Sequence, residues 1–396
     1  MSKSGRLRAG LCALLFAAGA SSAAAAPSSE ASLPEAGSTR PLKPQPRGAL
    51  TLDLELQRAA ERLLRGSKPV EGAVVAVEPR SGRILSFAAL GGSGSFDVLT
   101  RARLPAASLF KIVTTTALFE NTELSLQDEV CINGGMHGIE RRHLEPARGP
   151  GRECGRFAWA LGHSKNAVFA QLATRLLTRG DLLGTAERLG FNGKLTLDGE
   201  QQAELGRLSV PYNDLAFART AAGFQGSSLS PLGAAYLMTL IARAGAPVEL
   251  SLHEPPALGA AQDAPPAAPL FSARTAQRLT RMLEVTVETG TSRAAFTAPG
   301  GKRYLPGIRV AGKTGTLKPG QGEDTMTSWF VGFAPSRNPA VVVSVMLVNG
   351  ATYRRKANEL ARDLLRTYFR SHGHAQTVTD PFDEPSPDAL ADVASR

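Results

Sequence analysis

The sequence predicts an α+β fold built on one central antiparallel sheet. Two runs rich in β-branched and small apolar residues, 72–77 and 84–89, lie near the start of the folded region, and three more, 308–316, 327–334 and 340–348, lie near its end. Segments with helical spacing fill the chain between them. Strands at both ends of a chain and helices in its middle favour a sheet that joins the two ends. We therefore expect five strands and a helical middle region.

The first elements follow from local patterns. The fold is expected to begin at 49–52, and the segment 54–64 is predicted to be a helix with Leu56, Ala59, Ala60 and Leu63 on one face. The polar turn 78–83 joins the first two strands into a hairpin. Further helices and one loop rich in Pro and Ala complete the prediction: helices at 106–120, 158–178, 182–190, 231–244, 272–288 and 355–370, and the loop at 252–270.

The two ends of the chain differ from its middle. A basic start, an apolar run and a small-residue stretch make residues 1–26 a predicted secretory signal peptide. Residues 27–48 have the composition of a linker. Residues 49–372 are predicted to form one folded domain, and residues 373–396 are predicted to be a disordered tail. We therefore expect an exported, periplasmic or otherwise extracytoplasmic protein. An uncleaved leader that anchors the protein in the membrane stays open as an alternative.

The composition limits the classes of partner. The chain has 396 residues, 43% of them hydrophobic and 20% charged, as in a globular protein. Its formal net charge is +10, but the arginines are scattered and no dense basic run alternates with aromatic residues. We therefore expect no nucleic acid partner. The charge is expected at most to favour association with an anionic cell envelope.

Two cysteines, Cys131 and Cys154, remain once the leader is removed. An even pair in an exported protein is typical of a disulfide, which would close a loop rich in glycine and arginine. Two buried free thiols are the alternative. The spacing of Cys and His residues matches no zinc site, so no metal is expected. The loop has no assigned role.

Ser108 and Lys111 are the first candidate for chemistry. They lie three residues apart in a predicted helix, so both side chains project from one face. A serine hydroxyl becomes a useful nucleophile when a base takes its proton, and a lysine can be that base when its pKa is lowered. Alone the pattern has little weight, since Ser108 could begin the helix and Lys111 could be solvated.

Ser164 and Asn166 form the second candidate, in Ser164-Lys165-Asn166. A hydroxyl and an amide two residues apart can point into one cleft, where the hydroxyl can relay a proton and the amide can hold a lysine and a substrate carbonyl. The alternative is that one of them caps the helix that follows.

The third candidate is Lys313-Thr314-Gly315-Thr316, at the end of a predicted strand. Side chains alternate in a strand, so Lys313 and Gly315 are expected on one face and the two threonines on the other. Gly315 is expected to let a ligand backbone approach closely. An ammonium and hydroxyls suit a substrate carboxylate. The alternative is an edge strand that a lysine protects from pairing.

In this order, Ser-x-x-Lys, Ser-x-Asn and Lys-Thr-Gly resemble the motif set of the penicillin-binding protein transpeptidase family. Further stretches are similar to that family: 51–57, 72–85, 105–111, 230–232, 290–293 and 327–335. The resemblance covers roughly residues 50–370. It implies a β-lactamase/transpeptidase-like fold, in which helices flank the sheet and form a mostly helical subdomain.

The resemblance also implies roles. Ser108 would attack the carbonyl between the last two D-alanines of a peptidoglycan stem peptide, and Lys111 would accept its proton. Ser164 would pass a proton to the leaving amine, and Asn166 would hold Lys111 and the substrate amide. Lys313, with Thr314 and Thr316, would engage the terminal carboxylate, and the N–H groups of Ser108 and Thr316 would form an oxyanion hole. No metal or cofactor is implied, and β-lactams would be covalent inhibitors.

Other outcomes of the same chemistry stay open. A D,D-carboxypeptidase or endopeptidase would differ only in whether water or an amine attacks the acyl-enzyme. A serine β-lactamase ranks lower, because the segment 187–192 does not reproduce the deacylating element of class A enzymes. The intact motifs argue against a β-lactam sensor or a degenerate wall-binding module.

The chain is expected to be a stand-alone domain, because it has no room for a glycosyltransferase or a large pedestal domain.

Overall fold

The computed structural model describes residues 48–92, 94–198, 201–254, 267–317 and 325–373. The predicted signal peptide, nearly all of the predicted linker and tail, and most of the predicted loop at 252–270 lie outside these residues. The described residues belong to one compact unit, which begins at Arg47.

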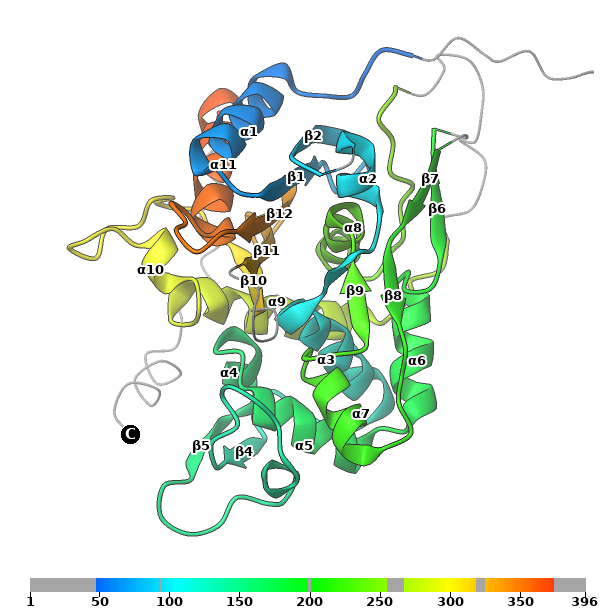
Figure 1. Cartoon of the computed structure of the whole chain (residues 1–396), viewed down its shortest axis with the longest axis vertical. Coiled ribbons are helices and arrows are strands. Elements are labelled where there is room, and N and C mark those ends of the chain that lie inside the picture. The colour runs from blue at the N-terminus through cyan, green and yellow to red at the C-terminus, as the bar shows by residue number, and fades with distance from the viewer. Residues whose placement is uncertain (1–47, 93, 199–200, 255–266, 318–324, 374–396) are drawn as a thin grey trace, which may run out of the picture. The chain divides into compact units, whose positions relative to one another are not determined.

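A five-stranded antiparallel sheet lies at the centre of this unit, as the sequence predicted (Figure 1). The order β10-β11-β12-β1-β2 places the N-terminal hairpin beside the three C-terminal strands, with Val74 opposite Val345. The bounds of these strands are β1 Glu71–Val77, β2 Ile84–Leu90, β10 Ala311–Leu317, β11 Met326–Ala334 and β12 Val341–Asn349. The third predicted strand begins at Ala311 rather than Ile308.

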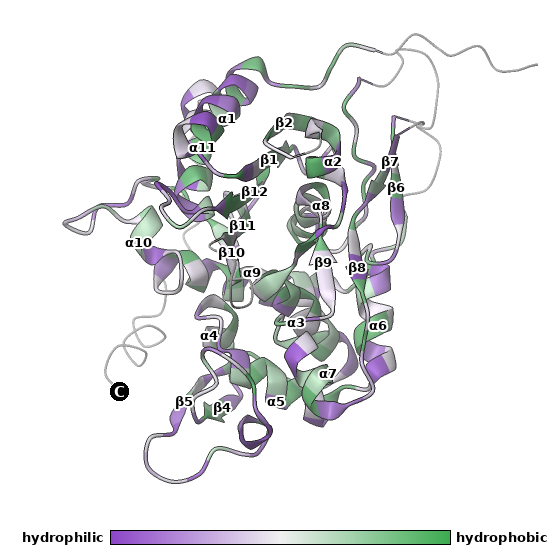
Figure 2. Ribbon diagram, in the orientation of Figure 1, coloured by the Kyte–Doolittle hydropathy of each residue, from purple (hydrophilic) through white to green (hydrophobic). Residues whose placement is uncertain are grey.

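Helices cover both faces of the sheet. Helices α1 (Leu54–Ser67) and α11 (Ala357–Ser371) lie side by side on one face, and α8 (Pro231–Ala242) and α9 (Ala273–Glu288) lie on the other (Figure 1). Because side chains alternate along a strand, each strand contributes to both cores. Figure 2 shows that the sheet strands are mostly hydrophobic, whereas α1 alternates between hydrophobic and hydrophilic residues.

The sequence determines α1 through its cap and its spacing. Asp53 accepts hydrogen bonds from the N–H groups of Glu55 and Leu56, which satisfies two donors at the start of the helix. Leu56, Ala60 and Leu64 recur every four residues and are buried against the sheet. Leu63, which we expected on the buried face, is only partly buried at its edge.

The middle of the chain is mostly helical, as predicted. Its principal helix, α3 (Phe110–Asn121), is buried along nearly its whole length. The other helices here are α2 (Ser95–Thr100), α4 (Phe157–Gly162), α5 (Asn166–Leu176), α6 (Arg179–Arg188) and α7 (Asp214–Ala221); α10 (Arg293–Phe296) follows α9.

Short strands also occur in this region, and the sequence did not predict them. They form three small sheets: β3 (Leu104–Pro105) with β9 (Ser227–Leu229) and β8 (Gly206–Leu208), β4 (Glu129–Ile132) with β5 (Glu153–Arg156), and β6 (Lys194–Leu197) with β7 (Gln201–Glu204). Strands of two to four residues are too short to show a periodic pattern.

Two predicted helices differ from the structure near the motifs. The helix predicted at 106–120 begins as a 3-10 turn, Ala107–Leu109, which precedes α3. The helix predicted at 158–178 is two helices, because Ser164 has φ = 56° and left-handed backbone cannot continue a right-handed helix. Among the described residues, no helix combines the length and the apolar character that a membrane span requires.

Candidate active site

The three sequence motifs meet at one cleft of about 650 Å³. Ser108 comes from the 3-10 turn before α3, Ser164 and Asn166 come from the α4–α5 turn and the start of α5, and Thr314 and Thr316 come from the edge strand β10. Segments that are more than 200 residues apart in the sequence therefore line one cleft. The motifs predicted that these residues share one site, and the structure brings them together.

Lys111 lies directly behind Ser108. Its Nζ atom is 2.8 Å from Ser108 Oγ and donates a second hydrogen bond of 2.7 Å to the carbonyl oxygen of Ala222. The side chain is completely buried. Burial, and then the charge of Lys313, hold the pKa of Lys111 well below its ordinary value. The lysine is therefore suited to be a neutral amine that accepts a proton from Ser108.

The residue before the nucleophile has a strained backbone. Ala107 has φ = 48°, a left-handed conformation that costs an L-residue roughly 1–2 kcal/mol. Neighbouring segments hold this turn: Ala106 N–H donates to Ser227 O at 3.2 Å, and Trp329 Nε1 donates to Pro105 O at 3.1 Å. Such local strain is typical of functional sites whose surroundings fix one geometry.

Lys313 connects the strand motif with the second motif. Its Nζ atom donates to Ser164 Oγ at 3.1 Å and to the carbonyl oxygen of Thr314 at 2.8 Å. The side chain is fully buried, and burial lowers the pKa of Lys313 to about 7. The charge of Lys313 therefore changes near neutral pH.

The two threonines of β10 face the cleft, and Lys313 and Gly315 lie on the opposite face of the strand. Thr314 Oγ1 lies 2.6 Å from Thr291 Oγ1. A Cβ atom on Gly315 would lie 3.3 Å from the Cβ of Trp329 and 3.4 Å from that of Ala107. This side of Gly315 therefore faces Trp329 and the turn that carries Ser108.

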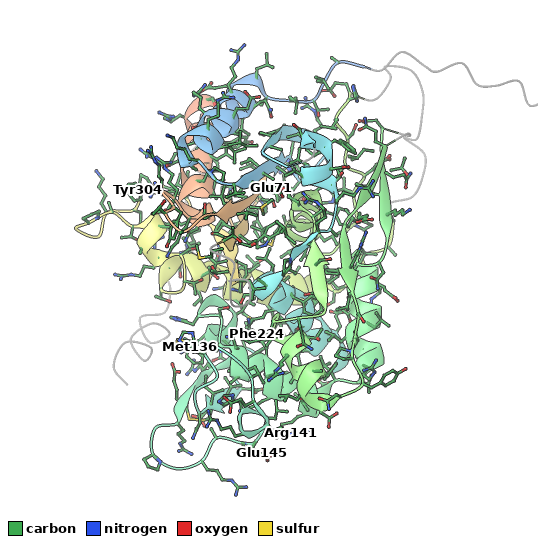
Figure 3. The ribbon with its side chains drawn as sticks, in the orientation of Figure 1. Glu71, Met136, Arg141, Glu145, Phe224 and Tyr304 are labelled. Carbon is green, nitrogen blue, oxygen red and sulfur yellow. A yellow bond between two sulfur atoms is a disulfide. The ribbon has the colours of Figure 1, made fainter. Side chains whose placement is uncertain are left out.

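Asn166 makes no hydrogen bond with Lys111, which corrects the sequence prediction. Its Nδ2 atom donates to the carbonyl oxygen of Met136 at 2.6 Å, whereas the hydrogen bonds of Lys111 Nζ go to Ser108 and Ala222. Met136 belongs to the segment between the two cysteines and is labelled in Figure 3. This segment approaches α5 closely, because a Cβ on Gly135 would lie only 2.8 Å from the Cβ of Ala167.

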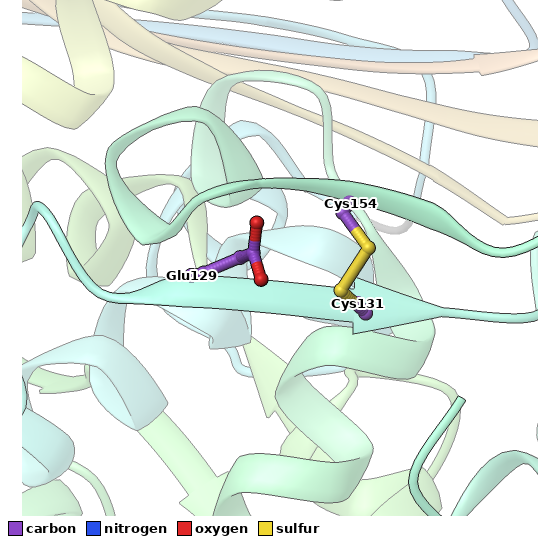
Figure 4. A group of neighbouring side chains, drawn as sticks. All are labelled: Glu129, Cys131 and Cys154. Carbon is purple, nitrogen blue, oxygen red and sulfur yellow. A yellow bond between two sulfur atoms is a disulfide. The ribbon is translucent and has the colours of Figure 1, made fainter. Parts of the chain in front are cut away.

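Cys131 and Cys154 form a disulfide, as predicted, with an S–S distance of 2.03 Å (Figure 4). They lie opposite each other on β4 and β5. The carboxylate of Glu129 lies nearby, and the three potential ligand atoms are within 4.8 Å of one another. Since the sulfur atoms are bonded to each other, they offer no thiolate, and this group does not fit a metal ion.

Several residues at the cleft were not predicted as site residues. Thr291 and Trp329 lie in stretches that already resembled the family, so a signal for them was present. Lys165 forms an ion pair with Glu153, and its Nζ atom lies 4.6 Å from the centre of the Trp159 ring. The sequence carried no signal for this pairing.

His163 also lines the cleft, beside Ser164. Burial and the nearby charge of Lys165 lower its pKa. At neutral pH this imidazole is therefore mostly uncharged.

Comparisons with known proteins agree with this geometry. The penicillin binding protein transpeptidase domain matches residues 72–366. The chain is 26% identical over 328 residues to the peptidoglycan D,D-transpeptidase PbpA of Mycobacterium tuberculosis. The aligned region covers 72% of this chain and 63% of PbpA. It thus spans less than two thirds of the length of that relative.

Solved structures show the same fold. The apo TP domain of Burkholderia pseudomallei penicillin-binding protein 3 has a TM-score of 0.66 and 20% identity, over 83% of this chain and 98% of that one. The imipenem acyl-enzyme complex of penicillin-binding protein A from M. tuberculosis has a TM-score of 0.61 and 22% identity, over 81% and 79% of the two chains. Since the domain match covers most of this chain, the protein belongs to the penicillin-binding protein transpeptidase domain family.

Proposed function

We propose that this protein is a peptidoglycan D,D-transpeptidase that acts on D-Ala-D-Ala stem peptides through an acyl-enzyme on Ser108. The observation that carries the proposal is the buried amine of Lys111, 2.8 Å from Ser108 Oγ, in a cleft that the other two motifs also line. The name of the relative PbpA supports the same activity. The match covers 63% of the length of PbpA.

Acylation follows from the positions of the side chains. Ser108 Oγ forms a bond to the carbonyl carbon of the penultimate D-alanine while its proton moves to Lys111 Nζ. The carbonyl π electrons move to the oxygen, which the N–H groups of Ser108 and Thr316 stabilise as an oxyanion hole, a contribution of about 3 kcal/mol per donor in other acyl-transfer enzymes. The C–N bond then breaks, and the leaving D-alanine amine takes a proton through Ser164. An amine of a second stem peptide attacks the ester by the reverse path.

Substrate binding uses the rim of the cleft. Charged Lys313 provides a positive potential below the hydroxyls of Thr314 and Thr316, which suits the terminal carboxylate of the stem peptide. Asn166 binds the substrate amide after its Nδ2 atom leaves the carbonyl of Met136, which occupies that donor in this structure.

β-Lactams are proposed to be covalent inhibitors, because they present a reactive carbonyl and a carboxylate to the same groups. A β-lactam acyl-enzyme is the state described for the structurally similar penicillin-binding protein A from M. tuberculosis. We also propose that the signal peptide directs the enzyme out of the cytoplasm, to the periplasmic or extracytoplasmic side where stem peptides are cross-linked.

A labelling experiment tests the proposal. Purified protein is incubated with a fluorescent penicillin, next to the Ser108→Ala variant. We expect one labelled serine in the wild type and none in the variant, and equal labelling of both would refute the assignment of the nucleophile. Products from a pentapeptide that ends in D-Ala-D-Ala, with and without an amine acceptor, then distinguish cross-linking from carboxypeptidase activity.

A further inference from the structure

The turn that follows α7 lies against both the base and the nucleophile. The carbonyl oxygen of Ala222 accepts the 2.7 Å hydrogen bond from Lys111 Nζ, and the carbonyl oxygen of Ala221 accepts a 2.8 Å hydrogen bond from Thr114 Oγ1. Lys111 and Thr114 are neighbours on one face of α3, and both are completely buried. Two successive carbonyl groups, one from the last residue of α7 and one from the first residue of the turn, are therefore fixed to the helix that carries the base.

The next residue, Gly223, places this turn against the nucleophile. It has φ = 82°, and a Cβ atom there would lie 2.1 Å from the carbonyl oxygen of Ala107 and 3.3 Å from the backbone nitrogen of Ser108. A side chain at this position would push the turn away from Ala107, so that the carbonyl of Ala222 would move relative to Lys111. Only glycine allows the observed contact.

We propose that the backbone carbonyl of Ala222 orients Lys111 for proton transfer, and that Thr114 and Gly223 are the positioning residues that hold this carbonyl in place. This inference rests on the proposed acylation of Ser108. It assigns to a backbone carbonyl the role that the sequence had given to the amide of Asn166.

The physical reason is the geometry of a neutral amine. It has two N–H groups and one lone pair, and it accepts a proton only when the lone pair points at the hydroxyl of Ser108. Donation of one N–H group to Ala222 O limits rotation about the Cε–Nζ bond, as the third member of a catalytic triad orients its base. After proton transfer the ammonium still donates to this carbonyl, which stabilises the charge.

The other groups that face Lys111 Nζ do not provide this orientation. Lys313 opposes the protonated form through its charge, and the ring of Phe169 has its centre 5.9 Å from Nζ and accepts no directed hydrogen bond of comparable strength. Among the described residues, the hydrogen bonds of Nζ go to Ser108 Oγ and Ala222 O.

Thr114→Val tests the inference, because it removes the hydroxyl and keeps the shape. The second-order rate of labelling by a fluorescent penicillin is measured against pH, together with the unfolding temperature. We expect a plateau rate at least about fivefold lower, the effect of losing roughly one hydrogen bond. The acidic midpoint should also move to lower pH, since a displaced carbonyl no longer favours the ammonium form.

Two further variants separate positioning from stability. Thr114→Ser restores the hydroxyl and should restore both the plateau and the midpoint. The hydroxyl of Thr116 donates within α3, to the carbonyl oxygen of Ile112 at 2.9 Å. The labelling rate of folded Thr116→Val should therefore depend on pH as it does in the wild type. A wild-type profile in Thr114→Val, with only a lower unfolding temperature, would overturn the inference.

Gly223→Ala has its own matched control in Gly245→Ala. Gly245 has φ = 92°, and its Cβ atom would lie 2.2 Å from the carbonyl oxygen of Phe271, at the far end of α8. Both variants should lose stability, but only Gly223→Ala should lose labelling per folded molecule. Equal labelling of the two would count against a positioning role. A wild type that takes no label would instead overturn the proposed function, and this inference with it.

Discussion

Lys313 Nζ donates a 3.1 Å hydrogen bond to Ser164 Oγ, which joins the edge strand of the sheet to the turn between α4 and α5. The two residues are 149 positions apart. Because burial lowers the pKa of Lys313 to about 7, this contact connects an ammonium to the proposed proton relay below that pH and a neutral amine above it. The activity should therefore depend on pH near neutrality.

Acylation by a penicillin should give a bell-shaped pH profile. The rate rises as Lys111 loses its proton, and it falls above pH 7 as Lys313 loses the charge that attracts the carboxylate of the penicillin. The second-order labelling rate, measured at pH values below and above 7, reports both the acidic rise and the alkaline fall. As a control, the methyl ester of the same penicillin has no carboxylate and should lack the alkaline limb; an equal alkaline decline with the ester would contradict the role of Lys313.

Lys313→Met should stabilise the fold while it abolishes labelling. The folded-state pKa of about 7 lies below the ordinary value of 10.5, so between these values the unfolded state binds more protons and wild-type stability rises with pH. Removing a buried amine should add about 1–2 kcal/mol to the free energy of unfolding at pH 7.

Urea unfolding at several pH values checks this prediction. The advantage of the methionine variant should shrink as the pH approaches 10.5, the ordinary lysine value. An advantage that does not change with pH would mean that burial of the amine is not its source.

The double variant Cys131→Ser/Cys154→Ser should lose about 3 kcal/mol of stability, because the bridge no longer restricts the unfolded chain between β4 and β5. Urea unfolding with and without a reductant measures the loss. The reductant should lower the stability of the wild type to that of the variant and leave the variant unchanged. If the reductant did not change the free energy of unfolding of the wild type, the disulfide would contribute little to stability.

Asn166→Ala should separate activity from stability. The amide bonds to the exposed segment at Met136, where water can replace it, so the unfolding temperature should change little. The labelling rate should fall at least about tenfold, because one hydrogen bond to the bound β-lactam is lost in a desolvated site.

Gln171→Ala is the matched control on the same helix. Its buried amide donates to the carbonyl oxygens of His143 and Glu145, and Glu145 is labelled in Figure 3. We expect this variant to lose about 1–3 kcal/mol of stability, since two buried acceptors lose their donor, and to be labelled normally when folded. If Asn166→Ala lost stability but kept its labelling rate, while Gln171→Ala kept its stability but lost labelling, Asn166 would have no role in the site.

The sequence by itself determined the relationships that depend on local spacing. Ser108 and Lys111 lie three residues apart, so a single turn of helix brings them together whatever surrounds them. The five long strands, the face of α1 and the disulfide pair also follow from periodicity or composition. The order of the motifs was sufficient to indicate the family.

Tertiary structure alone decided which partners the site residues find. Asn166 bonds to Met136, Gly315 faces Ala107, and Lys111 donates to a carbonyl 111 positions away in the sequence. Every residue carries the same backbone carbonyl, so the sequence cannot mark the one at Ala222 that faces the base. Only the packing of the turn after α7 against α3 selects it.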